Sequence, residues 1–193
     1  SRAMKHARIR TAGGVRHGEY DDGTVTTDDR VYEVGDDADL LAPCEAGTFY
    51  CVGRNYTETL DQMDYDRPDE PSFFIKPPAA LLAHEEAIPY PTFTDELTYA
   101  GELAAVVGER CRAVSEHDVP DVIDGYTILN DVDALDQGNL PARKAFDGSA
   151  PLGPWIETDV DPTAIDMYTD VGGERRQEAN TAQMLFDPFE IVS

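Results

Sequence analysis

The sequence is poor in lysine and cysteine and has no long apolar run. Only three of its fifteen basic residues are lysines: Lys5, Lys76 and Lys144. Its three cysteines lack the CxxC spacing of zinc and redox motifs, so we expect neither a disulfide framework nor a zinc site. No apolar segment approaches the roughly 20 residues that cross a membrane as a helix. The absences therefore exclude disulfide-rich, zinc-binding and membrane-spanning classes.

Acidic residues dominate the charge. Asp and Glu number 39 against 15 Lys and Arg, which gives a net charge of −24. Such a surface repels phosphate backbones and anionic headgroups, so we expect neither a nucleic-acid partner nor a membrane partner. The acids are scattered rather than gathered in a tail. We interpret the surface as adapted to high salt, where charges are screened, and expect a cytoplasmic protein.

The chain divides into two parts by its pattern of short strands and turns. Residues 4–45 alternate strand-like runs with turn residues, including the hairpin signal Asp21-Asp22-Gly23, and predict a small N-terminal antiparallel β domain. Residues 46–193 read as the main domain, rich in strands with a few short helices, expected at 56–63 and 115–123. The fold class predicted is mostly β, of the α+β type. A Ser-x-x-Asp sequence at Ser115 predicts the cap of the second helix.

Carboxylates on predicted strands are the main candidates for chemistry. The sequence has no Walker loop, GxGxxG or GxSxG motif. Glu102 begins one strand, and Asp131 and Asp133 end another, two residues apart and so on one face if the strand continues. Clustered carboxylates favour a cation between them, and oxygen ligands suit Mg²⁺ or Mn²⁺. The residues alone leave open that these are ordinary surface charges.

A set of segments in one order carries a family resemblance. They are 51–56 (CVGRNY), 73–77 (FFIKP), 101–108 (GELAAVVG), 125–132 (GYTILNDV), 144–155 (KAFDGSAPLGPW) and 173–186. In these segments the sequence resembles the fumarylacetoacetate hydrolase family. The resemblance implies a mixed β-roll, a homodimer, and Mg²⁺ or Mn²⁺ held on two glutamates and an aspartate. It also implies a small anionic 2-oxo acid as substrate.

The sequence departs from the family at the metal motif. The family carries Glu-x-Glu on one strand, whereas here the first position is Ala100 and only Glu102 remains. The family aspartate is present as Asp131. The next residues, usually Ser-Ala-Arg-Asp, are here Asp133-Ala134-Leu135-Asp136. We hypothesise that Asp133 replaces the missing ligand, so that Glu102, Asp131 and Asp133 hold the metal; the alternative is a weakened or absent site.

The water-activating residues of hydrolytic members are also replaced. Their His and Glu correspond to Thr59 and Gln62, neither of which titrates near neutral pH, so C–C hydrolysis loses support. Chemistry through an enolate loses less, because the implied metal chelates the 2-oxo carboxylate and stabilises the developing oxyanion. Lys144 can then move the proton or hold the substrate carboxylate. The function predicted is a lyase or dehydratase of the 2-keto-3-deoxy sugar acid type, or an isomerase. The alternatives are an acylpyruvate-type hydrolase and a catalytically lapsed protein that binds a small acid.

The resemblance assigns the remaining polar residues. Lys144, Lys76 and Arg54 are implied as catalytic residues, and Gln137, Gln177 and Thr181 as substrate-binding residues. Family members continue past the position of Ser193 with further strands, so we expect the C-terminal part of the family domain to be absent from residues 46–193.

Overall fold

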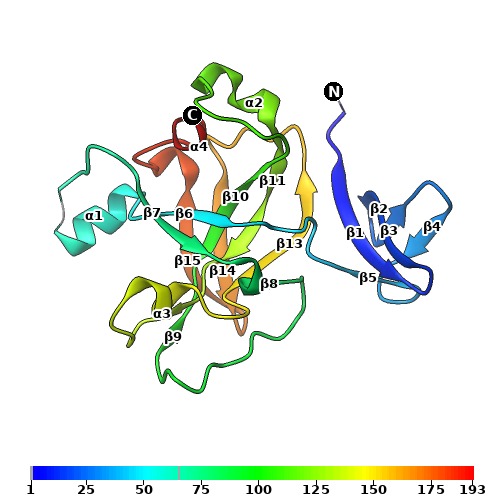
Figure 1. Cartoon of the computed structure of the whole chain (residues 1–193), viewed down its shortest axis with the longest axis horizontal. Helices are drawn as coiled ribbons and strands as arrows, with labels where there is room; N and C mark the ends of the chain where they lie inside the picture. The colour runs from blue at the N-terminus through cyan, green and yellow to red at the C-terminus, as the bar shows by residue number, and fades with distance from the viewer. Residues whose placement is uncertain (1, 65) are drawn as a thin grey trace.

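The computed structural model describes residues 2–64 and 66–193, and of the helix that precedes this gap it leaves the side chains of Thr59, Leu60 and Met63 undescribed. The fold is mostly β, as the sequence predicts (Figure 1). A nine-stranded sheet runs through both parts of the chain in the order β10-β11-β13-β1-β2-β3-β4, with β5 on β1 and β8 on β13. The two parts are thus joined by main-chain pairing, and the boundary near residue 45 stays a prediction.

The N-terminal part is an antiparallel meander. Its strands are β1 (Lys5–Thr11), β2 (Gly14–Asp21), β3 (Thr24–Thr26), β4 (Val31–Glu33) and β5 (Ala38–Leu40). The predicted hairpin between β2 and β3 is confirmed. Its two turn residues, Asp22 and Gly23, both have positive φ angles of 41° and 86°, which matches the twist that a tight hairpin needs.

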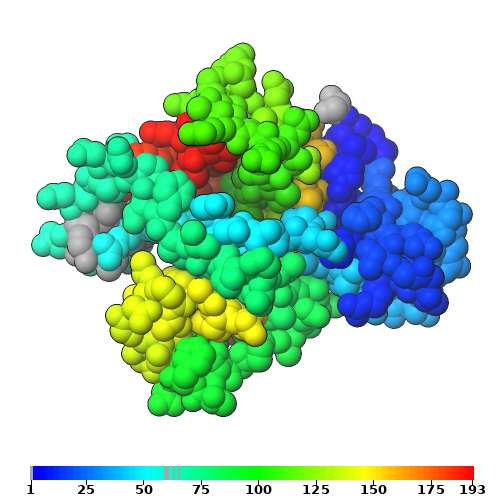
Figure 2. Space-filling model, viewed as in Figure 1, coloured from blue at the N-terminus to red at the C-terminus, as the bar shows by residue number. Residues whose placement is uncertain are grey.

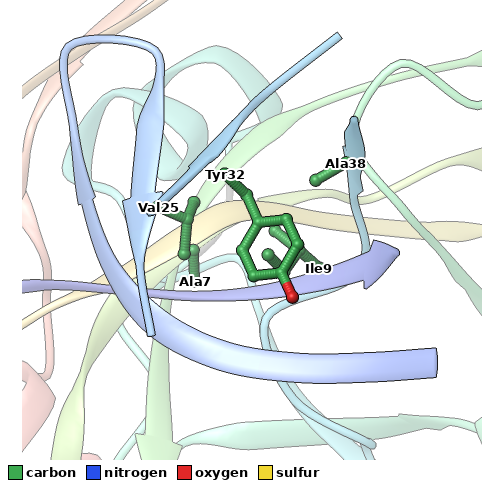
Figure 3. Close-up of a cluster of buried hydrophobic side chains, with 5 residues drawn as sticks. All are labelled: Ala7, Ile9, Val25, Tyr32 and Ala38. Carbon is green, nitrogen blue, oxygen red and sulfur yellow. The ribbon is translucent and has the colours of Figure 1, made fainter. Parts of the chain in front are cut away.

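An apolar core fills this N-terminal part. Five buried side chains from four of its strands meet there (Figure 3): Ala7, Ile9, Val25, Tyr32 and Ala38. Trp155, from β13 (Ala150–Glu157), packs against this cluster and stacks on Tyr20 with ring centroids 4.2 Å apart. The space-filling view shows the N-terminal residues as a lobe at one side of the molecule (Figure 2). Trp155 and the pairing of β1 with β13 fix that lobe to the main part.

The remaining strands build the main part. The large sheet continues through β8 (Leu81–Leu82), β10 (Gly101–Val107), β11 (Ile123–Asn130) and β13. Three strand pairs lie outside it: β6 (Phe49–Gly53) with β7 (Ser72–Lys76), β9 (Leu97–Thr98) with β12 (Asp133–Ala134), and β14 (Asp166–Val171) with β15 (Glu174–Asn180). A second apolar cluster packs in the main part and is formed by Ala80, Leu129, Ala150 and Leu152.

The helices are short. They are α1 (Thr57–Met63), α2 (Val119–Val122), α3 (Leu140–Lys144) and α4 (Pro188–Val192), with 3₁₀ turns at Pro78–Ala80, Glu116–Asp118 and Thr181–Gln183. The predicted cap at Ser115 is wrong, because its hydroxyl donates to the Asp118 carboxylate at 2.7 Å and caps no backbone N–H. The segment therefore opens as a 3₁₀ turn, and α2 is one turn long. No helix in the described part of the chain is long and apolar enough to cross a membrane.

Candidate functional site

Lys76 lies at the centre of the candidate site although its side chain is fully buried. It is the last residue of β7, on the strand face opposite Ile75, which is 53% exposed. Its Nζ donates to the carbonyl oxygens of Val132 and Ser149, both at 2.8 Å, and lies 2.9 Å from Asp131 Oδ1. Burial lowers the pKa of Lys76, and the Asp131 carboxylate opposes that shift. With its donors used in this way, Lys76 acts as a buried counter-ion that fixes three chain segments.

Asp131 follows the end of β11 and is held by its own backbone. Its N–H donates to the carbonyl oxygen of Ala100 at 2.8 Å, which fixes the end of β11 beside the start of β10. Its Oδ2 accepts a 2.6 Å hydrogen bond from Lys144 Nζ. Its Oδ1 is buried and accepts no hydrogen bond from the described residues, since Lys76 approaches at ion-pair distance without hydrogen-bond geometry. Asp131 is therefore paired with a lysine at each oxygen, and only Oδ2 accepts a hydrogen bond.

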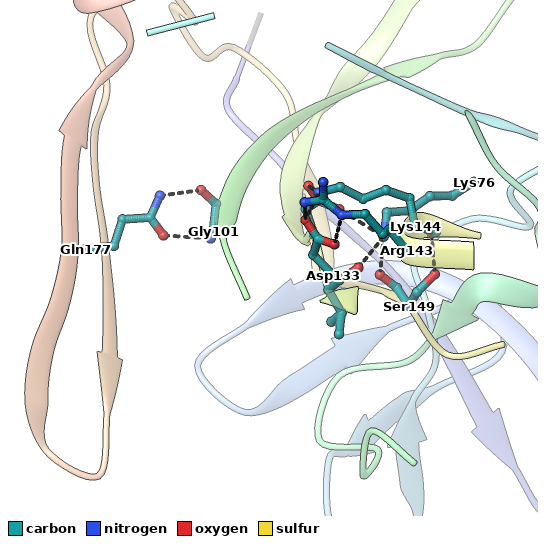
Figure 4. Close-up of polar contacts among 9 residues, drawn as sticks. Lys76, Gly101, Asp133, Arg143, Lys144, Ser149 and Gln177 are labelled. Carbon is teal, nitrogen blue, oxygen red and sulfur yellow. Dashed lines mark hydrogen bonds and ion pairs between the residues drawn. The ribbon is translucent and has the colours of Figure 1, made fainter. Parts of the chain in front are cut away.

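Asp133 is bound to two cations (Figure 4). Arg143 donates from Nε to Oδ1 at 2.9 Å and from Nη2 to Oδ2 at 2.5 Å. Lys144 Nζ lies 3.1 Å from the same Oδ2. Hydrogen bonds from Arg143 and Lys144 outweigh the effect of burial and lower the pKa of Asp133. Its oxygens are thus occupied by protein cations.

Glu102 lies on β10 opposite Leu129 and is largely shielded from water. Burial, with a smaller effect of the Asp131 charge, raises its pKa to about 7, and Lys144 opposes the rise. It makes no hydrogen bond or ion pair within the described residues, so its interaction with Asp131 and Lys144 is through space. Cys51 and Tyr56, which both interact electrostatically with Glu102, are also shielded from water. Burial raises the pKa of Cys51 to about 11 and that of Tyr56 to about 12.

The predicted metal ligands fit a divalent cation only in part. Among the described residues, no three His, Cys, Asp or Glu side chains are arranged to hold a metal ion. Asp133 does not fit, because Arg143 and Lys144 already occupy it. Glu102 does fit, since it makes no hydrogen bond or ion pair within the described residues. Asp131 fits only in part, because Lys144 occupies Oδ2 and Lys76 Nζ lies 2.9 Å from Oδ1. Mg²⁺ is commonly held by one or two carboxylates with waters. The hypothesis that Asp133 replaces the ligand missing at Ala100 therefore gains no support.

The predicted substrate-binding residues serve the framework. Gln177, on β15, grips the main chain of Gly101: its Oε1 accepts from the N–H at 2.9 Å and its Nε2 donates to the carbonyl at 3.3 Å (Figure 4). Gln137 donates to the Phe93 carbonyl at 2.9 Å. Thr181 is buried and its hydroxyl accepts from the Ile165 N–H at 2.8 Å. These contacts all join the protein's own backbone. A substrate-binding role for the three residues stays a prediction.

The remaining predicted positions lie on the segment that runs from the end of β6 through α1. Arg54 is exposed just after β6, in a left-handed backbone conformation with φ of 54°. Gln62, on α1, donates to Glu58 Oε1 at 3.0 Å along the helix surface. The side chain of Thr59 lies outside the described residues. Catalytic roles for Arg54 and Lys144 stay predictions, although Lys144 lies in the centre of the charged cluster.

Arg143 is the member of the site that sequence reasoning missed. The signal available was the pair Arg143-Lys144, following an acidic Asp133 in a chain that has lost the family arginine at Leu135. Leu135 is 40% exposed, whereas Arg143 reaches the charged cluster from α3.

The chain resembles proteins of known family. A model of the fumarylacetoacetate hydrolase C-terminal family matches residues 48–193. An uncharacterised protein of Archaeoglobus fulgidus is 38% identical over 158 residues, which are 80% of this chain and 63% of that protein. The mitochondrial oxaloacetate tautomerase FAHD1 of Bos taurus is 36% identical over 153 residues, 74% of this chain and 69% of that one. The chain spans roughly two thirds of the length of these curated relatives.

A solved structure has the same fold. The crystal structure of 2-hydroxyhepta-2,4-diene-1,7-dioate isomerase from Mycobacterium marinum superposes with a TM-score of 0.89 at 34% sequence identity. The superposition covers 98% of this chain and 79% of that one.

Proposed function

The chain belongs to the fumarylacetoacetate hydrolase family, and from that premise we propose that it is an isomerase of a small 2-oxo acid, acting through an enolate. The observation that carries the proposal is the position of Lys144. Its Nζ lies 2.6 Å from Asp131 and 3.1 Å from Asp133, beside Glu102. A lysine ammonium held by two aspartates is a fixed positive charge with protons to donate.

The reaction moves one proton. A 2-oxo acid loses a proton from C3 and gains one on the C2 oxygen, with the double bond moving from C2–O to C2–C3. The C3 proton passes to solvent water, and Lys144 stabilises the negative charge that develops on the C2 oxygen. Lys144 then donates the proton that completes the enol, and solvent returns a proton to the lysine, so no proton is gained or lost overall. Asp131 and Asp133 keep the ammonium in place, and Lys76 keeps Asp131 in place.

Glu102 and Asp131 are the residues that would hold Mg²⁺ or Mn²⁺. When bound, the metal supplies positive charge that polarises the 2-oxo group. At Asp131 the metal would share Oδ1 with Lys76, because Lys144 already donates to Oδ2.

Named relatives support isomerisation over hydrolysis. The bovine relative is named as a tautomerase and the mycobacterial structure as an isomerase. A fumarylacetoacetate hydrolase structure from Exiguobacterium antarcticum is more distant, at 29% identity. Hydrolysis also needs a group that activates water, and Gln62 is an amide that already donates to Glu58. Dehydration of a 2-keto-3-deoxy sugar acid begins with the same enolate and is the second candidate.

The test is a comparison of substrates in molar KCl with Mg²⁺. We expect the protein to accelerate the interconversion of the keto and enol forms of oxaloacetate, followed by ultraviolet absorbance. Lys144→Met should lower this rate at least 100-fold, in the range that general acid–base groups contribute. Lys5→Met, a change on β1 in the N-terminal lobe, should leave it unaltered.

The same assay separates the alternatives. Cleavage of an acylpyruvate without tautomerase activity would establish the hydrolase, and water loss from a deoxy sugar acid would establish the dehydratase. No reaction on any of the three would favour a lapsed, acid-binding protein. The homodimer implied by the family also stays a prediction, to be measured by sedimentation in the same buffer.

A further inference from the structure

The guanidinium of Arg143 is anchored along one edge only. Nε and Nη2 donate to the two oxygens of Asp133 at 2.9 Å and 2.5 Å, which is the fork geometry of a strong arginine–carboxylate pair. Nη1 contacts no partner among the described residues. The Arg143 side chain is 31% exposed, whereas the Asp133 side chain is 9% exposed. One edge of the guanidinium is therefore fixed to the protein and the other is open.

Arg143 and Lys144 present their charges side by side. Both are the last residues of α3. Asn139 caps the start of this helix, because its side chain accepts a hydrogen bond from the Ala142 N–H. Both cations approach the same oxygen, Asp133 Oδ2, at 2.5 Å and 3.1 Å. Nη2 and Nζ thus lie no more than about 5.6 Å apart, the upper limit that those two distances allow. A group of two or three heavy atoms is large enough to contact both.

Two neighbouring cations stand out on a protein that has 15 basic residues against 39 acidic ones. The chain has a net charge of −24, and an anionic ligand is repelled by most of its surface. At the charged cluster, three basic side chains face the acidic ones (Figure 4): Lys76, Arg143 and Lys144. Lys76 is fully buried, so only Arg143 and Lys144 offer charge to an incoming ligand.

We propose that Arg143 binds the carboxylate adjacent to the 2-oxo group of the substrate. The open edge of its guanidinium receives that carboxylate, while Lys144 reaches the neighbouring oxygen on C2. Asp133 is then a positioning residue that holds the guanidinium ready, which reduces the entropy lost when the ligand binds. Asp133 thus has a function at this site without ligating a metal. The inference rests on the proposed function, because it assigns the residue that recognises a 2-oxo acid.

The test is calorimetric titration with oxalate, a dianion with the planar shape of an enolised 2-oxo acid, in molar KCl with matched Mg²⁺. Arg143→Met should weaken oxalate binding about 10- to 100-fold, as expected for a lost charge-assisted pair. Arg143→Lys, which keeps the charge without the fork, should fall between that variant and the wild type. The matched control is Arg30→Met, which removes an arginine paired with Asp37 at 2.9 Å in the N-terminal lobe. It should leave the oxalate affinity within twofold.

A second variant guards against misfolding, because Arg143→Met leaves Asp133 without its main partner. In Asp133→Asn/Arg143→Met both charges are removed, and oxalate binding should be as weak as in the single variant. In the tautomerase assay Arg143→Met should raise KM more than it lowers kcat, since the contact exists in both ground and transition states.

The outcomes separate the two claims. Wild-type affinity for oxalate in Arg143→Met, with the tautomerase active, would overturn the role of Arg143 and leave the proposed function standing. A wild-type protein that neither binds oxalate nor tautomerises oxaloacetate would overturn both. The inference is supported if oxalate binds weakly to Arg143→Met and to Asp133→Asn/Arg143→Met while Arg30→Met keeps the wild-type affinity.

Discussion

The N-terminal lobe and the candidate site are buried by opposite means. The lobe encloses apolar side chains only, among them Ile9, Val25 and Tyr32, from strands that neighbour one another in the chain. The site instead encloses Lys76, which is fully buried, with Asp131 beside it at 9% exposure. Its partners come from β7, β11, α3 and the start of β13. One nine-stranded sheet supports both interiors.

The difference concerns how each region tolerates change. Apolar burial is non-directional and roughly proportional to area, so a smaller side chain removes part of the stabilisation. A buried charge network depends on every member, since removing one ion leaves its partner uncompensated away from water. We therefore expect the lobe to respond gradually to substitution and the site to respond sharply.

Lys76→Met is expected to have the largest effect. The change removes the ammonium that lies 2.9 Å from Asp131 Oδ1 and leaves the carbonyls of Val132 and Ser149 without their donor. Breaking a buried pair in this way lowers the free energy of unfolding by about 3–5 kcal/mol. Urea denaturation in molar KCl measures the loss.

The matched control is Lys5→Met in the lobe. Lys5 Nζ lies 4.8 Å from the centre of the Trp155 ring, and its loss should cost less than about 1 kcal/mol. Equal losses in the two lysine variants would contradict the contrast between the regions. The double variant Lys76→Met/Asp131→Asn should recover part of the stability, because it removes the unpaired charge.

Ile9→Ala tests whether the two regions are independent. Ile9 is fully buried in the lobe, and truncation of a buried isoleucine costs about 2–5 kcal/mol. We expect the variant to unfold at lower urea concentration while its folded fraction binds oxalate as the wild type does. Calorimetric titration of the variant and the wild type with oxalate, in buffer without urea, gives that comparison. A loss of oxalate affinity would instead show that the β1–β13 pairing transmits lobe packing to the site.

Glu102→Gln should stabilise the protein at high pH. The ordinary pKa of a glutamate is near 4.5, whereas burial raises that of Glu102 to about 7. The folded state therefore binds the proton more tightly, and ionisation of Glu102 lowers stability as the pH rises from 4.5 to 7. Glutamine removes this loss, so the variant should gain on the order of 2 kcal/mol at pH 8.

The pH dependence is the decisive part of that prediction. Unfolding is measured in EDTA and molar KCl at pH 5 and pH 8, and the difference between variant and wild type should grow between them. A difference that is equal at both pH values would show that Glu102 acts through packing and not through its charge.

The sequence predicts the mostly β fold, whereas the roles of the charged residues stay predictions. Strand-like runs that alternate with turn residues such as Asp22-Gly23 predict the β2–β3 hairpin of the lobe, because a hairpin depends on residues close together in the sequence. The family resemblance and the scarcity of lysine point to Lys76, Asp131 and Lys144, and the structure brings these three side chains within ion-pair distance. The backbone contacts of Gln177 were not foreseen, because they join Gly101 to a residue far along the chain.

The role of Asp133 was the hypothesis that the structure supports least. Two-residue spacing on a strand placed it beside Asp131, and no local pattern showed that Arg143 would reach it from α3. Arg143, ten residues further along the chain, forms an ion pair with Asp133, and this pairing decides whether the carboxylate is available as a metal ligand. Sequence periodicity carries no information about that choice.

Asp133→Asn is expected to have the smallest effect on metal binding, and that small effect separates the two acidic neighbours. In a calorimetric Mg²⁺ titration in molar KCl, Asp131→Asn should weaken binding at least tenfold, because it removes the charge of a carboxylate proposed as a ligand. Asp133→Asn should alter the affinity about twofold or less, since both of its oxygens serve Arg143 and Lys144. Equal losses in both variants would return Asp133 to the metal and contradict its assignment as the anchor of Arg143.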